Sequence, residues 1–69
     1  MDILDARGLS CPEPVVMMRA ALSSGEPAYR MVVDAVAAKE NVTRFAEHRG
    51  YDVTVTEKDG EYTLDVVKH

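Results

Sequence analysis

The sequence predicts an α/β two-layer sandwich in which two helices cover one face of a four-stranded mixed sheet, in the order β-α-β-α-β-β. Two segments carry apolar residues at helical spacing, and each follows a short apolar run typical of a strand. The last third alternates apolar and polar residues on both sides of Asp59-Gly60, as a β-hairpin does. Two amphipathic helices can cover only one face of such a sheet, so we expect its second face to be partly exposed.

The first strand and helix are predicted from the amino-terminal third. Met1–Ala6 is a short strand candidate, and a turn follows it. A helix should run from Pro12 to about Ser24, with Gly25 as its left-handed stop. The residues that share its buried face are Val15, Met18 and Leu22.

A second strand and a second helix follow. Residues Ala28–Asp34 contain a continuous apolar run, which is typical of a strand in the interior of a sheet. The right-handed crossover through the first helix should make the first two strands parallel. The second helix is predicted over Val36–His48 and should end at Gly50. Its predicted buried residues are Ala38, Val42, Phe45 and Ala46.

The closing hairpin has a predicted register. Asp-Gly favours a two-residue type I′ turn, which places matching side chains opposite one another. The predicted pairs are Lys58 with Glu61, Val55 with Leu64, Thr54 with Asp65 and Val53 with Val66. We expect Val53, Val55, Leu64 and Val66 to pack together beneath Val42 and Phe45.

Length, charge and cysteine content limit the functions that need to be considered. We treat residues 1–69 as a single domain, too small to enclose a large cofactor, and we expect none. Eight Lys and Arg against twelve Asp and Glu give a net charge of -4, which disfavours direct nucleic-acid binding. No apolar run approaches the ~18 residues of a membrane span, so no membrane partner is expected. The single cysteine excludes an internal disulfide and favours the reducing cytoplasm.

The candidate chemistry lies in Cys11-Pro12-Glu13-Pro14. Two prolines so close together are tolerated only in the first turn of a helix. The placement we favour has Cys11 at the N-cap, with Pro12 at N1 and Pro14 at N3; the alternative is a capping box from Ser10 to Glu13. At the N-cap the sulfur would meet the Glu13 N–H and the positive end of the helix dipole, which lower the pKa of a thiol. The opposing interpretation is that Cys11 is a small buried apolar residue.

Three other residues are weaker candidates. Arg7, four residues before the cysteine, is a candidate for stabilising its thiolate, although an arginine solvated in a loop is the alternative. We predict no metal site, because His48 lies on the polar side of its helix and His69 is the last residue.

Residues Leu4–Val15 (LDARGLSCPEPV) resemble the signature of the TusA/SirA-like sulfur-carrier family, which has a Cys-Pro-x-Pro motif at the start of its first helix. The resemblance covers the whole chain and implies the same two-layer fold. It implies that Cys11 accepts sulfane sulfur as a persulfide and passes it on. Gly8, Pro12, Glu13 and Pro14 would shape the loop around it. The chain would then act as a sulfurtransferase-type carrier.

The resemblance also implies partners. They would be a cysteine desulfurase or rhodanese-type sulfur donor and a downstream acceptor, for which a DsrE-like protein is one candidate. The stretch from Asp34 to Phe45 is more similar to the YedF-like branch, which is associated with selenium metabolism, than to the tRNA-thiolation carriers. The alternative function is a non-catalytic interaction or regulatory module in which Cys11 is structural.

Overall fold

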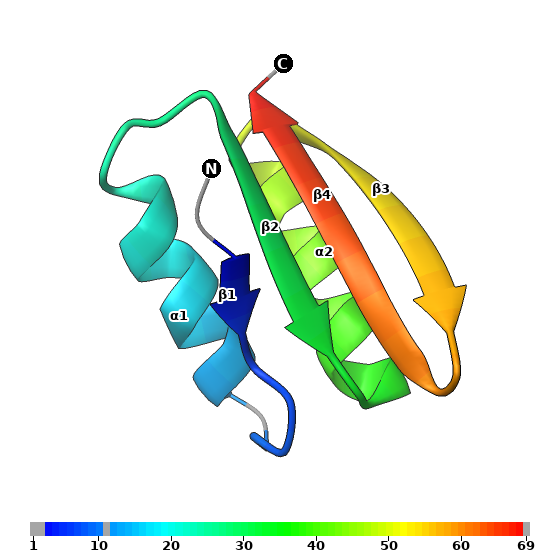
Figure 1. The fold of residues 1–69 in the computed structure, drawn as a ribbon. Helices are drawn as coiled ribbons and strands as arrows, with labels where there is room; N and C mark the ends of the chain where they lie inside the picture. The colour runs from blue at the N-terminus through cyan, green and yellow to red at the C-terminus, as the bar shows by residue number, and fades with distance from the viewer. Residues whose placement is uncertain (1–2, 11, 69) are drawn as a thin grey trace.

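The computed structural model describes residues 3–10 and 12–68 and confirms the predicted fold class. The elements are β1 (Ile3–Asp5), α1 (Glu13–Leu22), β2 (Ala28–Val33), α2 (Val36–His48), β3 (Tyr51–Lys58) and β4 (Glu61–Lys68). The strands form one sheet in the order β1-β2-β4-β3, and both helices lie on one side of it (Figure 1). β1 is parallel to β2, as the crossover predicts, while β4 is antiparallel to both β2 and β3.

The predicted hairpin register is confirmed. Lys58 lies opposite Glu61, Val55 opposite Leu64, Thr54 opposite Asp65 and Val53 opposite Val66. Asp59 and Gly60 have φ angles of 54° and 79°, the left-handed values that a type I′ turn requires at both central positions. The short turn and the period-two pattern therefore define the same pairing.

The helix boundaries agree closely with the prediction for α2 and less closely for α1. α2 occupies the predicted residues Val36–His48. α1 is shorter than predicted at both ends, because it begins at Glu13 and ends at Leu22. At its carboxyl end the Ser23 N–H donates to the Arg19 carbonyl, and Gly25 takes the predicted left-handed φ of 78°. The bond from Ser23 pairs one of the last carbonyl groups of the helix, which would otherwise lack a partner.

The core lies between the helices and the two central strands. The side chains with no exposed surface are Met18, Met31, Val33, Val42, Ala46, Leu64 and Val66, and no charged or polar residue among those described is buried. The core prediction was wrong for Val55, and it was confirmed only in part for four residues that pack against the core but are partly buried, namely Val15, Leu22, Phe45 and Val53. Val55 is 38% exposed because β3 is an edge strand. Phe45 is only partly buried, because Val42 and Ala46 are the α2 residues that face the sheet.

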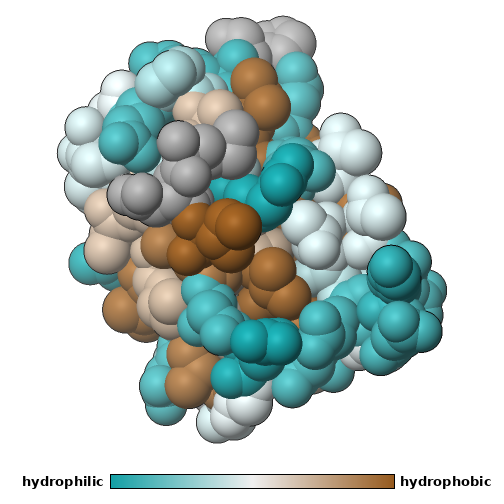
Figure 2. Space-filling model, viewed as in Figure 1, coloured by the Kyte–Doolittle hydropathy of each residue, from teal (hydrophilic) through white to brown (hydrophobic). Residues whose placement is uncertain are grey.

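The second face of the sheet is partly exposed, as predicted. Figure 2 shows this face, with hydrophobic residues near its middle and hydrophilic residues around them. Arg30 on β2 pairs with Asp65 on β4 at 2.6 Å, while Ile3 and Val67 are 61% and 48% exposed. Within residues 3–10 and 12–68, neither helix is long and apolar enough to cross a membrane.

Candidate functional site

The loop between β1 and α1 lies at the edge of the sheet where the parallel strands end. Since β1 and β2 run in the same direction, their carboxyl ends meet at this edge. The amino-terminal ends of both helices and the turn between β3 and β4 lie at the same edge (Figure 1). Two segments that are distant in sequence, the junction of β2 with α2 and the turn between β3 and β4, therefore lie at the same edge as the loop that leads to the Cys-Pro-Glu-Pro motif.

The start of this loop is attached to the core through its backbone. The Ala6 N–H donates to the Val32 carbonyl at 2.9 Å, which extends the β1–β2 pairing by one residue. Ala6 is buried, and Leu9 packs against the core while its N–H faces the Ala6 carbonyl at 3.4 Å. Gly8 has a φ of 76°, a conformation that glycine adopts without steric cost. The loop thus turns sharply at Gly8 and places Ser10 at the surface.

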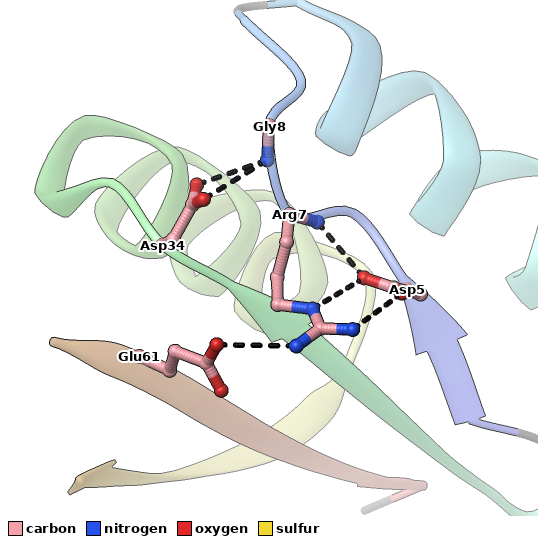
Figure 3. Close-up of polar contacts among 5 residues, drawn as sticks. All are labelled: Asp5, Arg7, Gly8, Asp34 and Glu61. Atoms are coloured by element: carbon pink, nitrogen blue, oxygen red, sulfur yellow. Dashed lines mark hydrogen bonds and ion pairs between the residues drawn. The ribbon is translucent and has the colours of Figure 1, made fainter. Parts of the chain in front are cut away.

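Arg7 binds two carboxylates at this edge (Figure 3). Its Nε and one terminal nitrogen donate to the two oxygens of Asp5, each at 2.9 Å, and the other terminal nitrogen donates to Glu61 at 3.1 Å. The Asp5 carboxylate also accepts the Arg7 backbone N–H at 3.1 Å. Hydrogen bonds from the Arg7 side chain and backbone lower the pKa of Asp5 from 3.8 to about 2, and the same carboxylates raise the pKa of Arg7. Arg7 therefore links β1 to the start of β4.

Asp34 makes a second link to the loop (Figure 3). It directly follows β2, and its two carboxylate oxygens lie 3.1 and 3.0 Å from the Gly8 nitrogen, which donates to them. Gly8 and Asp34 are far apart in the sequence, so this contact joins the loop to the junction of β2 and α2. The loop before Cys11 is consequently held by side chains from two other parts of the sheet.

The start of α1 differs from the prediction. Pro12, not Cys11, occupies the N-cap, so Pro14 lies at N2, still within the first turn, where a proline is tolerated. The Glu13 N–H donates to the Ser10 carbonyl at 2.9 Å, and is therefore not free to bind the sulfur as predicted. The alternative capping box is also absent, because this bond uses the backbone oxygen of Ser10. The cause is the backbone bond between Glu13 and Ser10, which uses the N–H that a side-chain cap would bind.

The structure describes only some of the predicted site residues. Cys11 itself lies outside the described residues, so its predicted pKa and its contact with Arg7 remain predictions. On either side of it Ser10, Pro12 and Glu13 are exposed, whereas Pro14 is buried against the core. The guanidinium of Arg7 is bound by carboxylates, and any contact with a thiolate would have to compete with them.

Other parts of the described chain are weaker candidates for a functional site. Within residues 3–10 and 12–68, no group of three or more His, Asp or Glu side chains could hold a metal ion. His48 is exposed and lines a shallow hollow of about 300 Å³ with Asn41, Arg44 and Phe45, along the carboxyl-terminal half of α2.

Sequence reasoning did not identify Asp5, Asp34 and Glu61 as parts of this site. One signal was available for Asp34, because it directly follows a strand parallel to the first one. Carboxyl ends of adjacent parallel strands meet at one sheet edge, so an acidic residue there lies near the loop that leaves the first strand. Nothing in the spacing pointed to Glu61.

Comparison with known proteins identifies the family. The family described as sulfurtransferase TusA matches residues 2–68. A protein of Methanocaldococcus jannaschii named as a candidate sulfur carrier is 41% identical, over 99% of this chain and 93% of its own length. A Bacillus subtilis protein with the same kind of name is 31% identical, over 86% of this chain and 81% of its own.

A solved structure agrees with the fold. The crystal structure of the SirA-like protein from Desulfitobacterium hafniense matches with a TM-score of 0.90 and 34% identity, over 97% of this chain and 96% of that one. The order of elements, the loop at the carboxyl edge and these matches support one conclusion. The chain belongs to the TusA/SirA-like family of sulfurtransferases.

Proposed function

We propose that this protein is a small sulfur carrier that accepts sulfane sulfur as a persulfide on Cys11 and passes it to a partner protein. The observation that carries the proposal is the position of the only cysteine in the sequence. It lies between the exposed residues Ser10 and Pro12, in a loop tied to the sheet, within a chain whose relatives are named as sulfur carriers.

The proposed transfer needs two displacement steps and no external oxidant. The Cys11 thiolate attacks the outer sulfur of a persulfide on the donor protein, a new S–S bond forms, and the donor cysteine leaves as a thiolate. A thiolate of the acceptor then attacks the outer sulfur on Cys11, and Cys11 leaves as a thiolate. The protons lost by the attacking thiols are taken up by the departing thiolates or by water. Each step is a thiol exchange, whose rate depends on how much of the attacking thiol is ionised.

A carrier of this kind needs a thiol that partner proteins can approach. Exposed residues at positions 7, 8, 10, 12 and 13 surround Cys11 in sequence, and they belong to the edge of the molecule and not to its core. The amino-terminal end of α1 contributes a positive potential, which favours a thiolate or a persulfide anion in its vicinity. We infer that the donor is a cysteine desulfurase or a rhodanese-type protein and that a second protein accepts the sulfur. A free thiol is best preserved in a reducing compartment such as the cytoplasm.

Mass spectrometry of the intact protein tests the proposal. After incubation with a cysteine desulfurase and cysteine, the wild type should gain the mass of one sulfur atom, and a reducing agent should remove it. Cys11→Ser should gain nothing. Selenocysteine as the substrate tests whether selenium is carried, as the resemblance to the YedF-like branch suggests. An unmodified wild type under conditions in which the desulfurase itself becomes persulfidated would favour the interaction module with a structural cysteine.

A further inference from the structure

We propose that Asp34 is a positioning residue for the sulfur transfer, because it fixes the loop that carries Cys11. This inference rests on the function proposed above. Asp34 comes from the end of β2, yet both of its oxygens face the backbone N–H of Gly8, three residues before the cysteine, at 3.1 and 3.0 Å. The side chain therefore acts on a different segment of the chain from the one to which it belongs.

The hydrogen bond between Asp34 and Gly8 lies just beyond the last backbone hydrogen bond between β1 and β2. The backbone pairing between β1 and β2 finishes with the bond from the Ala6 N–H to the Val32 carbonyl. Gly8 turns the chain with its φ of 76°, and its N–H donates to the side chain of Asp34 and not to a neighbouring strand. The Asp34 carboxylate binds this N–H, and hydrogen bonds to a charged acceptor are stronger than neutral ones. Among the described residues next to the cysteine, the Glu13 N–H donates to the Ser10 carbonyl at 2.9 Å.

The usual role of an acidic residue at this point of a fold would be different. Asp34 lies directly before Ala35, the N-cap of α2, and an Asp close to a helix start commonly accepts N–H groups of that helix. Here α2 has no side-chain cap, although its first turn would accept one. Both oxygens of Asp34 are directed to Gly8 instead. The carboxylate thus binds the loop before α1 and not the start of α2.

A positioning role predicts that removal of the Asp34 carboxylate slows sulfur transfer between proteins but does not slow alkylation by a small reagent. Without the Asp34 carboxylate, the loop loses its link to β2, and Cys11 is less often oriented toward a persulfide held by another protein. Loss of orientation slows a reaction between two large partners, where a displacement of about 1 Å can cost about a hundredfold in rate. A small alkylating reagent approaches from any direction and needs no such orientation. Removal of a nearby negative charge also favours the thiolate, so alkylation should not slow down.

The experiment compares Asp34→Ala and Asp34→Asn with Asp65→Asn as a matched control. Asp65 accepts a hydrogen bond from Arg30 on the open face of the sheet, so its replacement also removes a carboxylate acceptor, but one away from the loop. We expect kcat for sulfur transfer from a cysteine desulfurase to fall about ten- to a hundredfold in Asp34→Ala. Asp34→Asn should fall less, because the amide oxygen can still accept from Gly8. The rate of iodoacetamide alkylation, measured across pH, should be equal or higher, and Asp65→Asn should match the wild type in both assays.

The outcomes separate the proposal from the function on which it rests. Transfer at the wild-type rate in Asp34→Ala would overturn the positioning role, as would an equal fall in transfer and alkylation. Faster amide hydrogen exchange at Gly8 in Asp34→Ala, with circular dichroism unchanged, would support it independently of any sulfur donor. A wild-type protein that takes up no sulfur would refute the proposed function, and with it the role of Asp34 in transfer.

Discussion

The core of this protein and the loop at its carboxyl edge are held together by different forces. Met31, Val42 and Leu64 have no exposed surface, and no polar residue among those described is buried with them. The loop packs against this core only through Ala6 and Leu9, and its exposed residues Arg7 and Gly8 are held by ion pairs and hydrogen bonds to surface carboxylates. Burial stabilises the fold, whereas polar contacts determine where the loop lies. Mutations of buried side chains should therefore lower the stability of the fold, and mutations of the polar contacts should change the position of the loop.

The energies involved support this separation. Burying one large apolar side chain contributes about 1.5–3 kcal/mol, and several such side chains make up the core. Exposed ion pairs contribute about 0–1 kcal/mol each, and salt screens them further. Arg7 is about half exposed, so its pairs with Asp5 and Glu61 add little to the total stability. These ion pairs matter for the geometry of the loop, because each fixes the distance between particular atoms of the loop and the sheet.

The largest loss of stability is expected from Leu64→Ala. Leu64 lies on the central strand β4 and has no exposed surface. Truncating a buried leucine costs about 2–5 kcal/mol, because the transfer energy is lost and a cavity remains. A domain of this length has roughly 3–10 kcal/mol of stability in total, so the variant could be unfolded at room temperature. Urea denaturation measures the change, with Val55→Ala on the exposed edge as a control that should lose far less. Similar losses in both variants would contradict the assigned core.

Phe45→Ala should have an intermediate effect. A fully buried phenylalanine costs about 3–5 kcal/mol on truncation to alanine, and the partly exposed ring of Phe45 should cost less. The Arg49 guanidinium lies 4.8 Å from the ring centre, and the loss of this contact adds about 0.5–1 kcal/mol. Urea denaturation of Phe45→Ala, Phe45→Leu and Arg49→Gln separates the two contributions. A loss in Phe45→Ala as large as that in Leu64→Ala would show that the ring is part of the central core.

The two prolines of the motif should behave differently from each other. Pro14 is fully buried, and removing its ring carbons should cost roughly 1–2 kcal/mol, at ~0.8 kcal/mol for each buried methylene. Pro12 is exposed at the N-cap, so Pro12→Ala should change stability by no more than about 1 kcal/mol. Pro12→Ala should nevertheless slow the proposed sulfur transfer, because the residue next to Cys11 gains backbone freedom. Equal thermal stability of the two variants would contradict the different burial of the two rings.

The hairpin and α2 could be predicted in detail because their information is local. The alternation of side chains and the Asp59-Gly60 turn specify the register without knowledge of the remaining fold. The boundary of α1 was less well determined, because two nearby prolines fit more than one alignment of the first turn. The backbone bond between Ser10 and Glu13 decided between them, and no side chain in the sequence signals that bond.

The contacts of the loop could not be predicted from local patterns. Arg7 binds Glu61, and Gly8 binds Asp34, across large separations in sequence. Both contacts depend on the strand order β1-β2-β4-β3, which places the ends of β1 and β2 near the start of β4. The sequence predicted the strands, the direction of the first two and the interior position of the second, but it did not predict that β4 lies beside β2. Charged residues at strand ends consequently had several potential partners.

The smallest predicted effect concerns the Asp5–Arg7 pair and depends on pH. The pKa of Asp5 is lowered to about 2, so the folded state holds its carboxylate in the charged form more firmly than the unfolded state does. This contribution to stability is complete above the ordinary value of 3.8, and it is lost as the pH falls toward 2. Asp5→Asn lacks it at every pH. The free energy of unfolding should therefore be lower for Asp5→Asn than for the wild type at pH 7.

The difference between the two proteins should shrink between pH 4 and pH 2, the range set by the two pKa values. Solvent screens this exposed pair, so the difference should be small and should decrease further in high salt. Urea denaturation at several pH values measures it, and Arg7→Gln provides the control, since it removes the side-chain part of the same pH-dependent component and leaves only the bond from the backbone N–H of residue 7. If the difference persisted unchanged down to pH 2, the Asp5 carboxylate would not be held by Arg7 in solution. Among the carboxylates at this edge, Glu61 and Asp34 would then hold the loop without Asp5.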